Sequence, residues 1–256
     1  MSRYFFKDTT VLLGRSMRHI FRSVDTIITT AITPIALMLL FVYVFGGAIK
    51  TSISSDENYV DYLLPGIMLI AIASGIAYTA VRLFTDLKSG IFERFQSMPI
   101  ARSAVLWAHV LTSLVANALS LAIIVLVALL MGFRTAASPL AWLAVIGILA
   151  LFTLALTWLA VIAGLSAKSV DGASGFSYPL IFLPFISSAF VPTDTMPAPV
   201  RVFAENQPVT SIVTTIQDLF AGRPVGGSIW IALAWCLGIL VIAYIFATVV
   251  YRRKIS

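Results

Sequence analysis

Residues 103–133 read SAVLWAHVLTSLVANALSLAIIVLVALLMGF, and none of these 31 residues is Asp, Glu, Lys or Arg. A helix that crosses about 30 Å of hydrocarbon needs roughly 20 such residues in a row. The run is therefore long enough to cross a lipid bilayer. Across the whole chain 60% of the residues are hydrophobic and 11% are charged, whereas an ordinary soluble domain carries about 25% charged residues. The sequence predicts a membrane protein.

Other uncharged runs of this length lie on both sides of residues 103–133. They occupy residues 26–49, 62–81, 135–167, 172–193 and 224–251. The next longest run, residues 206–217, is too short to span a bilayer. We therefore predict an all-α membrane protein of one domain, residues 1–256, with six transmembrane helices. Their predicted positions are about residues 27–48, 61–81, 104–131, 140–164, 175–193 and 228–250.

An even number of crossings places both termini on one side of the membrane. If that side is the cytoplasm, 13 of the 17 Lys and Arg residues fall in cytoplasmic segments. The other four are Lys50, Arg134, Arg201 and Arg223. Cytoplasmic loops carry an excess of Lys and Arg, so the sequence predicts that both termini are cytoplasmic. The formal charge of +6 then reflects membrane orientation, and no nucleic-acid partner is expected.

Residues 3–22 have the spacing of an amphipathic helix. Arg15, Arg18 and Arg22 fall on one face, and Met17 and Ile20 fall on the other. A basic face opposite an apolar face is typical of a helix that lies in the membrane interface among lipid headgroups. The alternative is a solvated basic tail.

The segment between the second and third predicted spans is longer than a turn requires. Within it, Ile91 and Phe95 are four residues apart, with Phe92 beside them, the pair Glu93 and Arg94 between them, and Pro99 after them. This pattern predicts a short helix with an apolar ridge that ends before the proline. Such a helix either docks into a groove of a soluble partner or rests on lipid, and the residues alone favour neither.

Two short apolar helices are predicted between the fifth and sixth spans, in a segment punctuated by prolines. They are too short to span, so we expect them to fold back into the membrane or against the bundle, as a lid or as a plain cap. Pro34 in the first span, and Pro179 with Pro184 in the fifth, are expected to kink or break those helices. Asn117 is the one amide within a span, and an interhelical hydrogen bond is its expected role, with a substrate contact as the alternative.

Several kinds of chemistry have no candidate residues in this sequence. No G-x-x-x-x-G-K-[ST] motif, paired carboxylate site or His cluster occurs, and a lone Cys236 offers no metal site. An enzyme is therefore not expected, and neither is a metal site. The six uncharged runs, by definition, also lack the Asp, Glu or Arg that ion-driven pumps place at membrane depth. The energy for transport would have to come from another subunit. His109, near the start of the third span, has no assigned role.

Three stretches resemble the permease subunits of type-2 ABC exporters, particularly the bacterial daunorubicin-resistance type of drug-efflux permease. They are GIFERFQSMPIAR at residues 90–102, LPFISSAFVP at residues 183–192 followed by Met196 and Pro197, and QPVT at residues 207–210. Gln207 stands where the family usually has Asn, and Gln217 where it often has Arg. No role is carried over to these two positions.

The resemblance implies roles and partners for this chain. Residues 3–22 would be the interfacial helix and residues around 89–97 the coupling helix, whose Ile91, Phe92, Glu93, Arg94 and Phe95 contact a separate ATP-binding subunit. That subunit would hold ATP and Mg, and this chain no cofactor. Two copies of the chain in a bacterial cytoplasmic membrane would move a hydrophobic or amphipathic compound, drug-like or lipid, outward. Candidate pathway or gate residues are Asn117, Pro184, Phe185, Phe190 and Phe203.

Three other functions stay open from the sequence. Composition does not distinguish this chain from an exporter of a lipid-linked glycan in the same family. A structural membrane protein without transport, or an ion channel, belongs to a different class.

Overall fold

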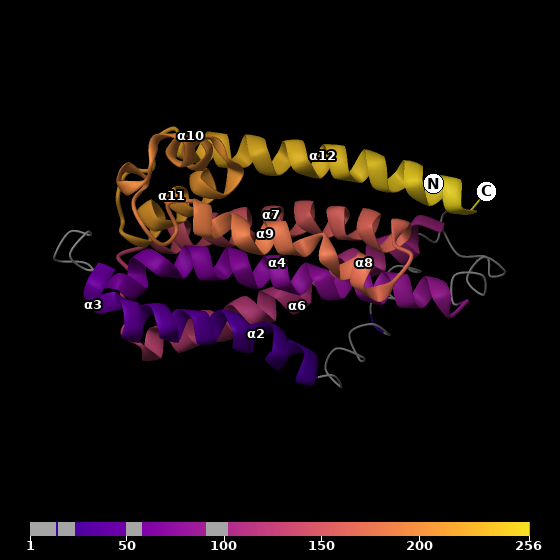
Figure 1. Ribbon diagram of the computed structural model, residues 1–256, viewed down its shortest axis with the longest axis horizontal. Helices are drawn as coiled ribbons and strands as arrows, with labels where there is room; N and C mark the ends of the chain where they lie inside the picture. The colour runs from indigo at the N-terminus through magenta and orange to yellow at the C-terminus, as the bar shows by residue number, and fades with distance from the viewer. Residues whose placement is uncertain (1–13, 15–23, 50–57, 91–101, 256) are drawn as a thin grey trace.

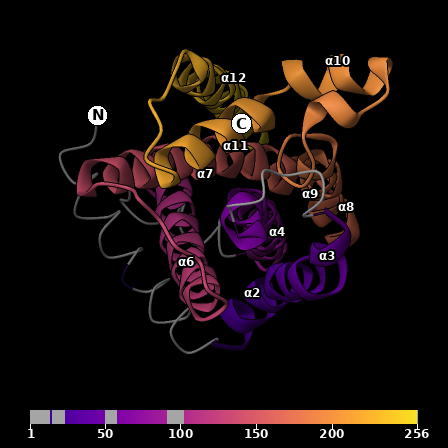
Figure 2. The ribbon, with the colours of Figure 1, turned by 90° about the vertical axis from the view of Figure 1, so that its left-hand side faces the viewer.

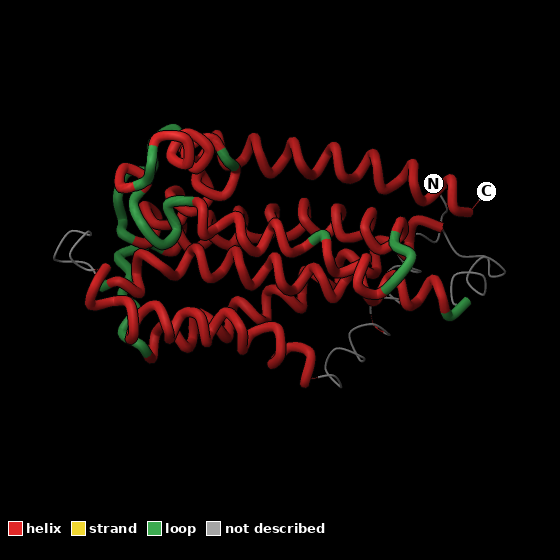
Figure 3. Tube along the Cα trace, viewed as in Figure 1, coloured by secondary structure: helices red, strands yellow, loops and turns green. Residues whose placement is uncertain are grey.

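The structure is a computed structural model that describes residue 14 and residues 24–49, 58–90 and 102–255. These residues form helices joined by turns and short loops, and no strand occurs among them (Figure 3). The all-α prediction is confirmed for this part of the chain. The interfacial helix predicted at residues 3–22 lies outside it apart from one residue, and so does nearly all of the predicted coupling helix.

Helix α4 (Tyr59–Lys88) lies at the centre of the bundle. Every residue from Leu63 to Ala73 is buried, and a helix that is buried on all faces must be enclosed by other elements. Figure 2 shows this enclosure in a view along the bundle. The surrounding helices are α2 (Val24–Leu39), α6 (Arg102–Leu130), α7 (Pro139–Ser166), α8 (Val170–Gly175) and α9 (Ser177–Phe182).

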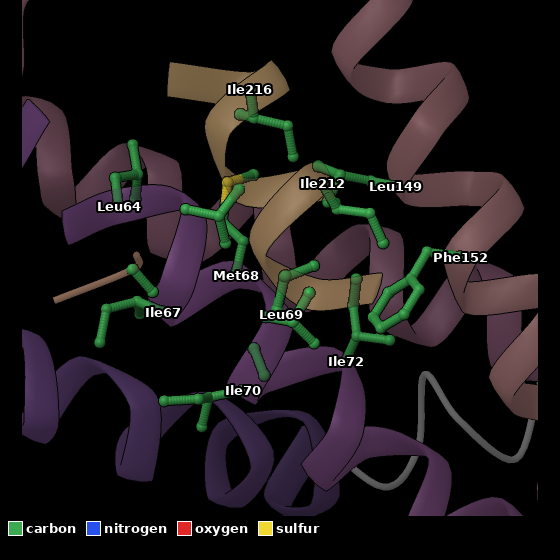
Figure 4. Close-up of a cluster of buried hydrophobic side chains, with 14 of the residues drawn as sticks. Leu64, Ile67, Met68, Leu69, Ile70, Ile72, Leu149, Phe152, Ile212 and Ile216 are labelled. Carbon is green, nitrogen blue, oxygen red and sulfur yellow. The ribbon is translucent and has the colours of Figure 1, made fainter. Parts of the chain in front are cut away.

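The core is formed where α4 meets α7 and α11 (Pro208–Phe220). Side chains from the three helices gather around Met68 and Leu69 (Figure 4). Leu149 and Phe152 come from α7, and Ile212 and Ile216 come from α11. At membrane depth there is little water to exclude, so close van der Waals packing is the main force that holds these helices together.

Among the described residues, four helices are long and apolar enough to cross a membrane, judged by length and composition. They are Tyr59–Lys88, Ala104–Leu130, Pro139–Ser166 and Ser228–Lys254. These correspond to the predicted second, third, fourth and sixth spans. The predicted first and fifth spans correspond to shorter apolar helices, Thr30–Phe45 and Val170–Ile186. The six-span topology therefore stays a prediction.

The fifth predicted span is broken, as its prolines indicate. It consists of α8, α9 and the 3-10 helix η3 (Leu183–Ile186), in which Pro184 lies in the first turn. It also begins at Val170 instead of residue 175 and ends at Ile186 instead of residue 193. The early start has a local cause, because the Ser169 hydroxyl accepts a hydrogen bond from the Gly172 amide at 3.1 Å and caps α8.

The first predicted span is continuous as far as the structure describes it. Helix α2 runs through Pro34 without interruption and passes directly into the π-helix η1 (Leu40–Phe45) and the short α3 (Gly46–Ile49). The irregular turn therefore lies after Pro34, at η1, and π-helical turns are a recognised site of helix distortion.

Helices α10 (Ala198–Asn206) and α11 lie at the end of the bundle opposite the C-terminus of α12 (Ser228–Ile255), as Figure 1 shows. The two short helices predicted between the fifth and sixth spans are present. They differ in environment: α11 has a largely buried face that packs on α4, α7 and α12. Val202 and Phe203 of α10 are exposed. Helix α11 is therefore part of the core, and α10 is a surface element.

The described cations gather at one end of the bundle. Helices α4, α7 and α12 run toward the end where the chain terminates, here the C-terminal end, and α6 runs from it toward the opposite end (Figure 1). Cations at the C-terminal end are Arg82, Lys88, Arg102, Lys168, Arg252, Arg253 and Lys254. Those at the opposite end are Arg134, Arg201 and Arg223.

Candidate functional site

The predicted coupling residues Ile91, Phe92, Glu93, Arg94 and Phe95 lie outside the described residues, and so do Arg15, Arg18 and Arg22. The structure does describe where the coupling segment departs from α4. Ser89 and Gly90 donate backbone hydrogen bonds to the carbonyls of Thr85 and Leu87, at 2.9 and 3.5 Å. Gly90 has a φ of 73°, the left-handed conformation in which glycine commonly ends a helix.

His109 joins the two helices that flank this segment. Its Nε2 lies 3.3 Å from Oδ2 of Asp86, and the imidazole is only 8% exposed. Because Asp86 is in α4 and His109 is in α6, the contact fixes the distance between the end of one helix and the start of the next. No pattern in the sequence predicts this pairing, since the two residues are 23 positions apart and neither belongs to a motif.

A polar network joins α4, α6 and α7 inside the bundle. The Thr79 hydroxyl donates to Ser113 Oγ at 2.9 Å, and Ser113 Oγ lies 3.3 Å from Thr157 Oγ1. Asn117 Nδ2 donates to the Ser113 carbonyl at 2.9 Å and also contacts Ser113 Oγ at 3.3 Å. Three helices are thus connected through one serine hydroxyl.

The hydrogen bonds that the structure shows for Asn117 differ from the expected interhelical bond. Both hydrogen bonds shown for Asn117 go to Ser113 in its own helix, and Ser113 makes the contacts between helices. A Cβ at Gly75 would lie 2.3 Å from Asn117 Oδ1, so the amide fills the space left by a glycine on α4. The contacts between helices come from the hydroxyls of Thr79, Ser113 and Thr157. The sequence does not predict these contacts, because a hydroxyl in a helix can instead bond to a carbonyl of its own helix.

Three of the candidate gate residues lie together in an aromatic cluster. The rings of Phe185 and Phe190 are stacked, with centroids 4.8 Å apart and planes within 4°. Phe41 of η1 lies 4.7 Å from Phe190 and 6.3 Å from Phe185. Pro184 is buried beside them. The cluster therefore joins the first predicted span to the fifth, and sequence reasoning missed Phe41.

Two contacts hold this cluster against α4. The Tyr59 hydroxyl donates to the Phe190 carbonyl at 3.3 Å. A Cβ at Gly66 would lie 2.6 Å from the Cβ of Ala189, so only glycine allows the turn before Phe190 to approach α4 this closely.

The five candidate pathway residues do not form one site. Asn117 belongs to the polar network inside the bundle, and Phe203 lies on α10 with 51% of its surface exposed. None of the ring contacts in the described part of the chain involves Phe203. Only Pro184, Phe185 and Phe190 are brought together.

Gln207 and Gln217, which had no assigned role, anchor α11 at its two ends. Gln207 Nε2 donates to the carbonyl of Leu183 at 3.3 Å and also to that of Ile186. These carbonyls belong to η3, where the break in the fifth span leaves backbone groups to be satisfied. Gln217 Nε2 donates to the Tyr62 carbonyl of α4 at 2.9 Å. Neither role could be predicted from the sequence, because the carbonyls that accept these hydrogen bonds lie more than twenty positions away.

Two of the described cations at the end opposite the C-terminus form ion pairs. Arg201 Nε lies 2.7 Å from Glu205 Oε1, and Arg223 Nε lies 3.1 Å from Asp218 Oδ1. The hydrogen bond that the Arg201 guanidinium donates to Glu205 raises the pKa of Arg201 above its usual value. Within the described residues, no group of three or more His, Cys, Asp or Glu side chains is placed to hold a metal ion.

Comparison with known proteins places these features in a family. Residues 7–221 match the family model described as ABC-2 type transporter. The chain is also 28% identical over 232 residues to the daunorubicin resistance ABC transporter permease protein DrrB1 of Streptomyces coeruleorubidus, a match that covers 89% of this chain and 80% of the relative. This chain belongs to the ABC-2 type transporter family.

Proposed function

We propose that this permease is the membrane half of an ATP-driven exporter that moves a hydrophobic or amphipathic compound out of the cytoplasm or the inner leaflet. The name of its Streptomyces relative, a daunorubicin resistance permease, supports a drug-like cargo. The apolar character of the four long helices is consistent with a cargo that partitions into the membrane.

We propose that the cargo passes between two copies of the chain. One observation supports this route: the centre of the bundle is filled by α4. Leu63 to Ala73 are buried without interruption, so a path along the axis of one copy would have to displace the central helix. Transport between two copies requires no such rearrangement. Tyr43, Tyr178 and Phe182 are exposed by 60% or more beside the aromatic cluster, and this surface is the proposed contact with the second copy.

We also propose six crossings with both termini in the cytoplasm of a bacterial inner membrane. The segments α2, η1 and α3 follow one another from Val24 to Ile49, and 26 residues at 1.5 Å each would extend about 39 Å, more than the roughly 30 Å of hydrocarbon. Seven of the ten described cations lie at the C-terminal end, which supports a cytoplasmic position for that end.

The motor of the proposed exporter is a separate ATP-binding subunit, which would bind the coupling helix between α4 and α6. Differential binding of this helix in the two nucleotide states would bias the permease between two conformations. The His109–Asp86 contact lies at the base of that segment. It would keep α4 and α6 together while the segment moves.

The test is a Glu93→Ala variant purified together with the ATP-binding subunit from the same membrane. We expect ATP hydrolysis to persist and ATP-driven uptake of a drug-like probe into inverted vesicles to fall at least tenfold, because the variant removes a contact that passes the ATPase motion to the permease. Glu205→Ala, at the opposite end of the bundle, is the matched control and should leave export unchanged.

Failure of a P-loop ATPase to co-purify, together with an unchanged Glu93→Ala variant, would contradict the proposal. Passive conductance without nucleotide would instead indicate a channel. Export of a lipid-linked glycan, but not of drug-like compounds, would keep the mechanism and change the cargo.

A further inference from the structure

An apolar groove runs along the outside of the bundle between α6 and α7. It encloses about 440 Å³ and has Met68 of α4 as its floor. On α6 its lining extends from Leu114 to Leu129, and on α7 from Trp142 to Thr153. Its volume is within the range of small-molecule sites, about 300–1,000 Å³.

The length of the groove suits one leaflet of a bilayer. At 1.5 Å per residue, its α6 wall extends about 22 Å and its α7 wall about 17 Å, and half of a hydrocarbon core is about 15 Å. Leu126 is 60% exposed on one wall and Ile146 is 57% exposed on the other. The groove is therefore open to the surrounding lipid along its side.

The lining of the groove favours an occupant without polar groups. Thr153 is its one hydroxyl residue, and that hydroxyl already donates to the Leu149 carbonyl at 2.7 Å. A saturated or unsaturated acyl chain satisfies this surface, because it offers dispersion contacts along its whole length and requires no hydrogen bond.

The loop at one end of the groove contains a cation. Arg134 is in the short loop that joins α6 to α7, a few residues beyond Leu129 and before Trp142. Its backbone amide donates to Asp61 Oδ1 at 3.0 Å, and its guanidinium contacts the Phe133 carbonyl at 3.5 Å.

Arg201 and Arg223, the other described cations at this end, each form an ion pair with a carboxylate. Arg134 is exposed, and a guanidinium in this position suits a phosphate group.

We propose that this groove is a binding site for an anionic phospholipid of the leaflet on the side of the α6–α7 loop. One acyl chain would lie along the groove, and the phosphate would lie at Arg134. The site faces away from the proposed contact between copies, and it does not depend on the proposed transport function.

The experiment uses the full-length chain in nanodiscs that contain a trace of phospholipid with a diazirine in one acyl chain. Phosphatidylglycerol and phosphatidylcholine probes are compared, and the labelled peptides are identified by mass spectrometry. We expect labelling of residues 114–129 and 142–153 to exceed labelling of the exposed helix α12 at least threefold. We also expect phosphatidylglycerol to be preferred about fivefold, the effect of one cation near the surface.

Two variants test the two parts of the site. Ala118 and Ala122 are exposed and line the groove, so the double variant Ala118→Phe/Ala122→Phe should fill it and reduce groove labelling to the level of α12. Ala234→Phe, at an exposed position of α12, is the matched control. Arg134→Gln should remove the preference for phosphatidylglycerol, whereas Arg201→Gln should keep it.

Equal labelling of the groove and of α12 would overturn the proposal, because it would indicate bulk lipid only. Equal labelling by both probes in the unchanged protein would overturn the role of Arg134. A cross-link between copies through a cysteine at Leu126 would show that a second copy occupies the groove. Each result stands whether or not the chain exports a compound.

Discussion

Gly75 is the residue that gives Asn117 its place inside the bundle. A Cβ at this position would lie 2.3 Å from Asn117 Oδ1, and the amide is held by its hydrogen bonds to Ser113. Gly75→Ala should therefore force the amide out of position and destabilise the protein by about 1–3 kcal/mol. The measurement is the midpoint of thermal unfolding in detergent.

Gly147 provides the matched control for this prediction, because a Cβ there would meet nothing within 4 Å. Gly147→Ala should leave stability unchanged or raise it by up to about 1 kcal/mol. In the double variant Gly75→Ala/Asn117→Ala the clash is absent, so it should be as stable as Asn117→Ala alone. Strictly additive effects of the two substitutions would show that the contact does not couple them.

At the scale of elements, the long helices were predictable because charged residues mark where their apolar runs end. The third and fourth spans, predicted at 104–131 and 140–164, are helices at Ala104–Leu130 and Pro139–Ser166. Charges mark the limit of an apolar run and do not by themselves end a helix. This is why α4 continues past residue 81 to Lys88, through Arg82 and Asp86, both of which are compatible with a helix.

The fifth span was the element that the sequence could place least well. Its prolines predicted a break, but the residues that stabilise the broken helix lie more than twenty positions away. Gln207 donates to the carbonyls of Leu183 and Ile186, and no local pattern indicates such a bond. The close approach of Gly66 to Ala189 could not be predicted from the sequence either, because it depends on the packing of two distant segments.

The role of Gln207 can be tested at this element. Gln207→Leu replaces the amide with an apolar side chain of similar size and removes the donor, so the carbonyls of η3 lose their partner. We expect a loss of about 1–3 kcal/mol of stability, measured as a lower midpoint of thermal unfolding in detergent. Asn206→Ala is the adjacent control, since Asn206 is exposed and its side chain bonds within α10 to the Val202 carbonyl at 2.8 Å. Equal effects of the two substitutions would contradict the anchoring role.

At the scale of the whole molecule, the filled centre of the bundle and the exposed surface around Phe182 are the basis of the proposed contact between two copies. Phe182 is 62% exposed, and its ring lies 6.2 Å from that of Phe185 in the aromatic cluster. In a symmetric dimer that uses this surface, Phe182 of one copy lies close to the same surface of the other. Helix α12 is also apolar and exposed, and Ile245 on it is 53% exposed. It faces lipid in this arrangement.

Cross-linking distinguishes these two surfaces. In a background without the single cysteine Cys236, Phe182→Cys should give a covalent dimer with a short bifunctional maleimide, and Ile245→Cys should not. If the cargo passes between the copies, the yield from Phe182→Cys should also change when the ATP-binding subunit is trapped with a non-hydrolysable nucleotide, because the two faces move relative to one another. A dimer formed through Ile245→Cys instead would place the partner on α12 and would remove the aromatic cluster from the pathway.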